Sequence, residues 1–274
     1  MLLTRIPGPL LRPFVRSMWA QDPGPGALGA GAAARREHVL PTGDMHLVFR
    51  LSGPPLRLFA RASDAAGYTV GCAIVGGARS AFYMRDVSVA TRSVGAQLRP
   101  GAARALFGVP AGELAERHTP LDALWGAEAA LALERIHGAG TLAAQLAVFE
   151  TLLAERLAAH PHAMHPAIAQ ALTGLGSGLH VGRLVDASGY SHRRFIALFR
   201  DAAGLAPKRL ERVLRLQRVM AAWTSPDGPP WVELALQAGY SDQPHFNRDF
   251  LEITGLTPQA YRRAWPAAPN HVPV

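Results

Sequence analysis

Arginine and amide side chains occur at corresponding places in two short segments near the C-terminus. One segment carries Arg193 and Arg200, and the other carries Gln243, Asn247 and Arg248. A guanidinium group can donate two hydrogen bonds to O6 and N7 of guanine, and a side-chain amide matches N6 and N7 of adenine. A solvated helix could carry the same residues, so only their joint placement can distinguish base recognition from an ordinary polar surface.

The two segments belong to an internal repeat. The stretch LVDASGYSHRRFIALFRDAAGLAPKRL (residues 184–210) recurs as LALQAGYSDQPHFNRDFLEITGLTPQAY (residues 234–261). Both copies contain Leu, then Gly-Tyr-Ser, an aromatic residue, a second Phe four residues later and Gly-Leu-x-Pro. The second copy has one additional residue between Ser241 and Phe246. Matches at so many positions indicate two copies of one supersecondary unit.

Each copy has the pattern of a helix-turn-helix. Gly189 and Gly239 supply a turn with positive φ after a short helix, and Ser191 and Ser241 are placed to cap the next helix. Helical spacing predicts that its buried face is formed by Phe195, Leu198, Phe199 and Ala202 in the first copy, and by Phe246, Phe250 and Ile253 in the second. The outward residues then gather near the capped end, where a recognition helix offers side chains to base edges. They are Arg193, Ile196, Ala197, Arg200, Gln243, Pro244, Asn247 and Arg248.

At these residues the chain resembles the AraC/XylS family of transcription regulators. The family's signature in the second unit is matched by GYSDQPHFNRDF (residues 239–250) and GLTPQAYRR (residues 255–263), and the resemblance covers about residues 167–263. It implies that a long helix over about residues 208–223 joins the two units and sets the recognition helices roughly 34 Å apart, one DNA turn. Carried over position by position, it implies base-reading side chains at Arg193, Ile196, Ala197, Gln243, Pro244, Asn247 and Arg248.

Two departures from the family pattern stand in the first unit. Ile196 and Ala197 are apolar, so base recognition there depends on Arg193, with thymine methyl contacts as the alternative. Val185 stands where the family usually has a smaller alanine, which predicts a crowded crossing of the two helices.

Basic residues near the repeat are expected to meet the DNA backbone. Arg194, Arg200 and Arg209 complete the set predicted to bind DNA, and Arg209 and Arg212 are expected to touch only phosphates. The net charge is +8, and residues 181–218 hold nine basic against three acidic residues. After this stretch the charge balance turns slightly acidic, so the positive charge is concentrated in the first unit.

The first half of the chain predicts a small β-barrel or sandwich. Short β-type runs over residues 46–51, 68–75 and 87–94 are separated by Gly, Pro and Ser. LPTGDMHLVFRL (residues 40–51) and QLRPGAARALFGVPAGEL (residues 97–114) resemble the β-rich sensor domain of such regulators, which implies an effector site and helices that can dimerise. A later helical stripe fits either a core face or a dimer seam. It consists of Leu142, Leu146, Phe149, Leu153 and Leu157.

The expected fold class is therefore α+β, a β-barrel or sandwich with helices at its end, followed by an all-α domain of two helix-turn-helix units joined by a long helix. The predicted division is a sensor and dimerisation domain over residues 1–159, a linker at 160–166, the DNA-binding domain at 167–265 and a tail at 266–274. The Gly/Pro/Ala-rich stretch at 22–34 predicts a loop. A transmembrane run and a signal peptide are both missing from the pattern, which predicts a cytoplasmic protein.

The expected function is sequence-specific DNA binding by a transcription regulator. Its expected partners are promoter or operator DNA, a small-molecule effector, a second copy of the chain and, for an activator, RNA polymerase. An enzyme-like first domain that uses the helices for targeting, or an adaptor that has lost DNA binding, are the alternatives. No catalytic residue, metal or cofactor is expected.

Two features of the first domain bear on the enzyme alternative. Cys72, the single cysteine, stands in an apolar stretch that predicts a buried thiol, and it lacks the Pro-Cys-His-type setting of a reactive one. His38, Asp44 and His46 stand near one another but lack the histidine spacing of a metal-binding barrel.

Overall fold

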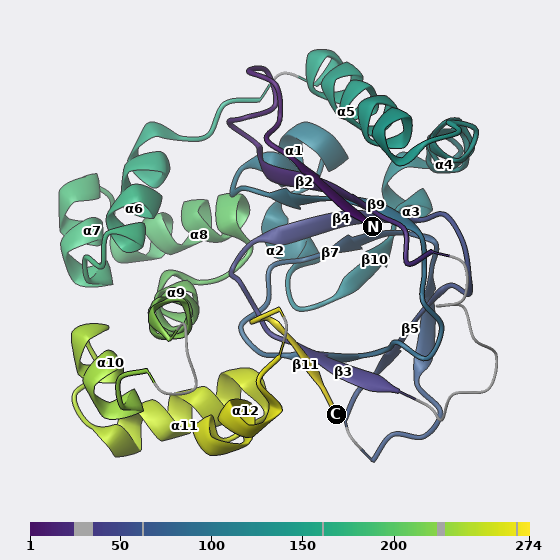
Figure 1. Ribbon diagram of the computed structural model, residues 1–274. Helices are drawn as coiled ribbons and strands as arrows, with labels where there is room; N and C mark the ends of the chain where they lie inside the picture. Colours follow the sequence, from purple (N-terminus) through teal and green to yellow (C-terminus); the bar gives the residue numbers. More distant parts are fainter. Residues whose placement is uncertain (25–34, 62, 161, 224–227, 267) are drawn as a thin grey trace.

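The computed structural model describes residues 1–24, 35–61, 63–160, 162–223, 228–266 and 268–274, and its first half contains two antiparallel sheets (Figure 1). Most of the loop expected at 22–34 lies outside the described residues. The first sheet has the strand order β1 (Leu2–Arg5), β2 (Val15–Gln21), β9 (Ser93–Leu98), β4 (Met45–Arg50), β7 (Ala73–Gly76) and β10 (His118–Pro120). The second has the order β11 (His271–Pro273), β3 (Arg36–Val39), β8 (Tyr83–Asp86), β5 (Leu56–Phe59) and β6 (Tyr68–Gly71).

Side chains alternate between two environments along the first sheet. On β4, Met45, Leu47 and Phe49 are buried, whereas His46 and Arg50 on the other face are half-buried. The apolar face is covered by α1 (Ala102–Phe107), α4 (Glu128–His137) and α5 (Leu142–Ala159), with the short α2 (Ala111–Leu114) and α3 (Asp122–Trp125) between them.

The predicted apolar stripe lies on α5. Leu146, Phe149, Leu153 and Leu157 are buried against the first sheet, and the rings of Phe49 and Phe149 meet edge to face at 5.7 Å. The stripe is thus part of the domain core, which favours the first of its two interpretations.

A group of helices follows, as the expected fold class requires. Their bounds are α6 (Pro166–Gly176), α7 (Val181–Ser188), α8 (His192–Ala203), α9 (Pro207–Ala222), α10 (Trp231–Gln237), α11 (Gln243–Thr254) and α12 (Pro258–Ala264). The long helix expected over about 208–223 is α9, which lies between α8 and α11 (Figure 1). The α+β class, with a β-rich part before two helix-turn-helix units, is confirmed.

The two helix-turn-helix units are buried in different cores. Phe195 and Phe199 of the first unit belong to the same continuous apolar cluster as the sheet and its helices. Phe246 and Phe250 of the second unit belong to a separate cluster, which also contains Leu40 from the end of β3. Each unit is therefore packed against the first domain by its own apolar contacts.

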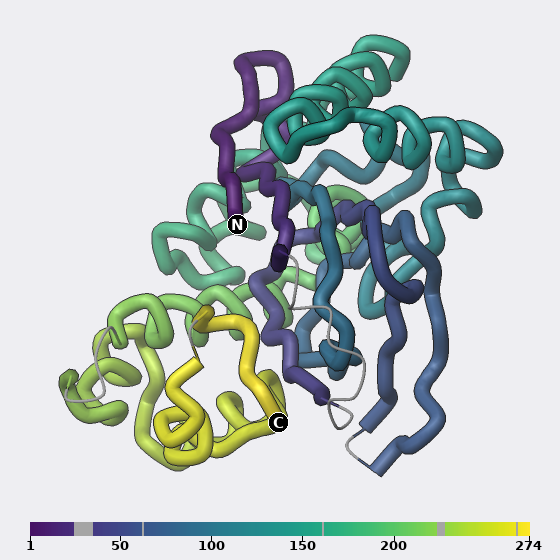
Figure 2. The backbone as a smooth tube through the Cα atoms, turned by 45° about the vertical axis from the view of Figure 1, so that its right-hand side comes forward, coloured from purple at the N-terminus to yellow at the C-terminus, as the bar shows by residue number. Residues whose placement is uncertain are grey.

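The segment expected as a C-terminal tail forms a strand in the second sheet. Strand β11 pairs antiparallel with β3, so that His271 lies opposite Val39 and Val272 lies opposite His38. Figures 1 and 2 both show the yellow end of the chain beside this strand of the first domain.

Cys72 differs from its prediction. The thiol is half-buried, and it lines a cavity of about 430 Å³ together with Arg50, Leu133 and His137. The reason is its position between β6 and β7, where the chain passes from one sheet to the other and the α4 helix covers it incompletely.

Candidate nucleic-acid interface

The first unit has the predicted helix-turn-helix geometry. Helix α7 ends at Gly189, which has φ +69°, a conformation that glycine adopts without strain. Ser191 caps α8, and its hydroxyl accepts a hydrogen bond of 3.4 Å from the Arg194 backbone N–H. Phe195 and Phe199 are fully buried below the helix.

The second unit repeats the turn but changes the cap. Gly239 has φ +91°, as the repeat predicts. The cap of α11, however, is Asp242 and not the predicted Ser241. The Asp242 carboxylate accepts 2.7 Å and 3.0 Å hydrogen bonds from the His245 N–H and the Ser241 hydroxyl. The one additional residue in this copy moves the cap by one position, because the buried Phe246 fixes the rotation of the helix.

Capping by a carboxylate places a negative charge at the start of α11. The hydrogen bond from the His245 N–H, aided by that from Ser241, holds the pKa of Asp242 below its usual value. The corresponding cap of α8 is a neutral hydroxyl. The two recognition helices therefore present different electrostatic potentials at their N-terminal ends.

The side chains predicted to read bases lie on the outer faces of α8 and α11. Arg193 and Ala197 are exposed on α8, whereas Ile196 is half-buried. On α11 the exposed side chains are Gln243, Pro244, Asn247 and Arg248. The side chains of Arg193, Arg194, Arg200 and Arg248 are exposed. No carboxylate of the described residues forms an ion pair with any of them. These guanidinium groups are thus available to an external anion.

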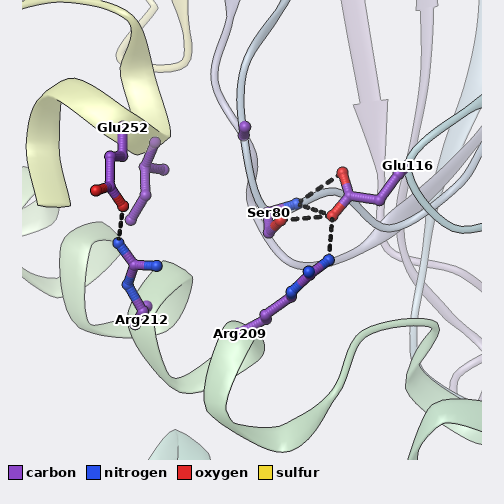
Figure 3. Close-up of a pocket in the computed structure, with 7 residues that line it drawn as sticks. Ser80, Glu116, Arg209, Arg212 and Glu252 are labelled. Atoms are coloured by element: carbon purple, nitrogen blue, oxygen red, sulfur yellow. Dashed lines mark hydrogen bonds and ion pairs between the residues drawn. The ribbon is translucent and has the colours of Figure 1, made fainter.

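Arg209 points toward the first domain. Its Nη1 lies 3.8 Å from Oε1 of Glu116, which also accepts hydrogen bonds from the backbone and hydroxyl of Ser80 (Figure 3). These groups line a cavity of about 330 Å³ between the two domains. The predicted phosphate contact at Arg209 therefore competes with an intramolecular partner.

Arg212, also expected at the phosphates, ties α9 to α11. Its guanidinium donates to Asp249 at 2.7 Å and 3.1 Å, and it bonds to Glu252 as well (Figure 3). The hydrogen bonds that Arg212 donates to the buried Asp249 carboxylate are the main reason why the pKa of Arg212 is raised. The structure gives Arg212 a role in holding the second unit together.

Histidine and aromatic side chains meet where the two sheets face each other. The ring of Tyr83 from the second sheet meets that of His118 from the first at 4.4 Å, and His46 meets Trp19 at 6.3 Å. Burial, with repulsion from nearby basic groups, lowers the pKa of His46 to about 4 and that of His118 to about 3. Both imidazoles are therefore neutral near pH 7.

His38, Asp44 and His46 do not converge on one point. Nδ1 of His38 lies 3.0 Å from the carbonyl oxygen of Thr254, and Asp44 accepts from Arg16 and Gln97. Over the described ranges, no cluster of three or more His, Cys, Asp or Glu side chains is arranged to hold a metal ion. Nor do those ranges contain a helix that is long and apolar enough to span a membrane.

Sequence patterns missed three features that position the interface. These are the Asp242 cap, the Arg212 bonds to Asp249 and Glu252, and the pairing of β11 with β3. Only the cap had a readable signal, since Asp directly follows the predicted Ser241 and is an equally good capping residue.

Two family models match parts of the chain. The family model described as "Helix-turn-helix domain" matches residues 184–264, and the model described as "Domain of unknown function (DUF6597)" matches residues 4–120. No curated protein matches the chain.

Similar solved structures include two of ToxT from Vibrio cholerae. A crystal form at 1.65 Å resolution has 10% identity and a TM-score of 0.44, and covers 84% of this chain and 97% of that one. A structure of unsaturated fatty acid-bound ToxT from strain SCE256 has 9% identity and a TM-score of 0.44, and covers 84% and 90%. The AraC-like transcriptional activator CuxR has 13% identity and a TM-score of 0.19, and covers 85% and 90%.

Proposed function

Residues 184–264 form an AraC-type helix-turn-helix domain behind an N-terminal domain of the DUF6597 type, and from this premise we propose that the protein regulates transcription by binding two successive major grooves of a specific DNA site. The observation that carries the proposal is the division of side chains on α8 and α11. Both helices bury aromatic residues and expose arginine or amide groups near their capped ends. That arrangement suits base reading by the start of a recognition helix.

The binding test uses duplexes selected from random-sequence DNA by the unaltered protein. Each selected duplex and a shuffled version of it are titrated at two salt concentrations. We expect tighter binding of the selected duplex, and an affinity that falls steeply with salt, because each neutralised phosphate contributes about −0.9 to the slope of log K against log salt. Equal affinity for both duplexes would support a non-specific binder, and no binding at either salt concentration would support an adaptor.

A small-molecule effector is proposed to bind between the two sheets. Neutral His46 and His118 each offer one donor and one acceptor, and Trp19 and Tyr83 supply flat apolar surfaces. Nδ1 of His118 is buried without a hydrogen-bond partner. A panel of metabolites can be screened by thermal denaturation, and a true effector should lose its stabilising effect in His118→Phe.

The homodimer contact is proposed to lie at β1. This strand is an edge of the first sheet, and Leu2 and Ile6 beside it are 60% and 77% exposed. Sedimentation should show a dimer for the unaltered chain and a monomer for Ile6→Asp. A monomer in both samples would remove this part of the proposal.

A further inference from the structure

The last residues of the chain form a physical connection between the second helix-turn-helix unit and the first domain. His271, Val272 and Pro273 lie opposite Val39, His38 and Glu37 of β3. The pairing extends beyond the strand, since the Val274 N–H donates to the carbonyl oxygen of Arg36 at 3.0 Å. A strand that follows α12 thus completes the edge of a sheet in the first domain (Figure 1).

Apolar and polar groups both fasten this strand. Val272 is 1% exposed and belongs to the core of the second unit, together with Leu40. The Gln217 side chain on α9 donates 2.9 Å hydrogen bonds to the Pro41 carbonyl and to Asn270. The three parts, α9, β3 and the C-terminal segment, are therefore joined at one place.

The same strand also reaches the polar groups of the first domain. Nδ1 of His271 lies 2.5 Å from Oε1 of Glu37, and the Glu37 carboxylate pairs with Arg85 at 2.7 Å. Glu37 and Arg85 come from neighbouring strands, β3 and β8. His271 thus adds a side-chain contact to the backbone pairing of β11.

The first unit is attached to the same domain by different contacts. Arg104 on α1 pairs with Asp201 on α8, and the Gly101 N–H donates to the Ala202 carbonyl at 2.8 Å. Neither attachment covers the outer faces, since Arg193 on α8 and Gln243 and Asn247 on α11 stay exposed. Docking to the first domain restrains the units without masking them.

We propose that β11 is a latch that fixes the second unit relative to the first, so that both recognition helices are already positioned when they meet DNA. The inference rests on the proposed DNA-binding function. Without the latch, α9 and two contacts with the first domain would hold the second unit, and it would sample other orientations. These contacts are the 2.7 Å hydrogen bond from the Phe82 N–H to the Ile253 carbonyl and the 3.0 Å contact of His38 with the Thr254 carbonyl. Binding both half-sites would then require ordering at the moment of association, which weakens affinity for the complete site.

The test removes or disrupts β11 alone. A chain that ends at Asn270 lacks the strand but retains Gln217, Pro41 and Asn270, the residues joined by the hydrogen bonds described above. Val272→Asp places a carboxylate at a buried apolar position, and Val274→Asp is its matched control, because the Val274 side chain is 64% exposed. Hydrogen exchange is measured without DNA for the amides of α10–α12 and of α7–α8.

We expect about tenfold lower protection in α10–α12 for the truncated chain and for Val272→Asp, with α7–α8 unchanged and the control like the unaltered protein. Unchanged protection of α10–α12, or an equal loss in both units, would overturn the latch. Because this readout contains no DNA, it is independent of the proposed function.

The second readout uses a duplex selected by the unaltered protein, and a derivative in which the half bound by the second unit is randomised. We expect both disrupted chains to lose roughly tenfold affinity for the complete site, and less than twofold for the derivative. An equal loss on both duplexes, or tighter binding of the complete site, would overturn the positioning role. If the unaltered protein selects no duplex, the proposed DNA-binding function is wrong. The hydrogen-exchange result still tests the latch in that case.

Discussion

The two helix-turn-helix units share a backbone plan but carry different charges. The outer surface of the first unit exposes Arg183, Arg193, Arg194 and Arg200, and its recognition helix has a neutral cap. The second unit exposes Gln243, Asn247 and a single arginine on its recognition helix, behind the charged Asp242 cap. An internal repeat can thus keep its backbone geometry while its two copies differ in charge, and we expect the first copy to attract phosphates more strongly than the second.

The cores of the two units differ as well. The first shares its apolar cluster with the sheet and helices of the N-terminal domain. The second is built around an aromatic group of its own, in which the ring of Trp231 lies 5.8 Å from Phe246 and 5.7 Å from Phe250. The first unit should therefore unfold with the N-terminal domain, and the second should be able to unfold by itself.

The largest expected effect comes from the two cores. Phe250→Ala should destabilise the second unit by about 3–5 kcal/mol, because it leaves a cavity in a small aromatic cluster. Phe199→Ala should cost a similar amount but destabilise the first unit and the N-terminal domain together. Proteolysis sites mapped during denaturant titration check both outcomes. Simultaneous opening of all regions in Phe250→Ala would contradict the separation of the cores.

Next in size is the pairing of α9 with α11. Arg212→Ala leaves the Asp249 carboxylate, which is 5% exposed as a residue, without its guanidinium partner, at a cost of about 2–3 kcal/mol to the second unit. Arg209→Ala is the matched control on the same helix, since Arg209 makes only a 3.8 Å contact with Glu116. Chemical denaturation measures the free energy of unfolding of both variants. If Arg212→Ala instead reduces the free energy of binding to non-specific DNA by more than it reduces the free energy of unfolding, Arg212 contacts phosphates.

Base reading gives a smaller effect, which we expect in both units. Arg193→Ala and Gln243→Ala should each weaken binding to a selected duplex by about 1–3 kcal/mol and leave binding to a shuffled duplex nearly unchanged. Arg194→Ala should weaken both duplexes alike and reduce the salt slope by about 1. Titration at several salt concentrations separates the two kinds of contact. Equal losses on selected and shuffled DNA for Gln243→Ala would contradict the assignment of base reading to the second unit.

The smallest expected effect concerns the caps. Asp242→Asn keeps a good capping group but removes the charge, so affinity for DNA should rise by less than about fivefold. Ser191→Asp should lower affinity by a similar amount in the first unit. Both changes should shrink as salt is added, because charges at the surface are screened. Affinity changes of the same sign in the two variants would show that the caps do not account for the electrostatic difference.

The internal repeat allowed much of the helical half to be predicted. Spacing around Gly189 and Gly239 placed both turns, and helical periodicity placed Phe195 and Phe246 in the core and Arg193 and Asn247 outside. These features are local, so they leave a pattern in consecutive residues. The prediction that the outward residues bind DNA is independent of that placement and stays a prediction.

Contacts between distant parts of the chain could not be predicted from the sequence in the same way. Strand β11 has only the three residues His-Val-Pro, so its pairing depends on an available edge at β3 and on the apolar cluster that buries Val272. The direction of Arg209 and Arg212 likewise depends on where Glu116 and Asp249 lie, which the spacing of basic residues along α9 does not encode.

The pairing of β11 with β3 has a consequence for the order of assembly during synthesis. A ribosome delivers the N-terminal strands first, yet the edge next to β3 is completed by residues 271–273, which are made long after β3. The nascent chain therefore carries an open sheet edge until these residues have been made. A chain shortened before residue 271 would keep that edge open, and an open edge can pair with a strand of another molecule.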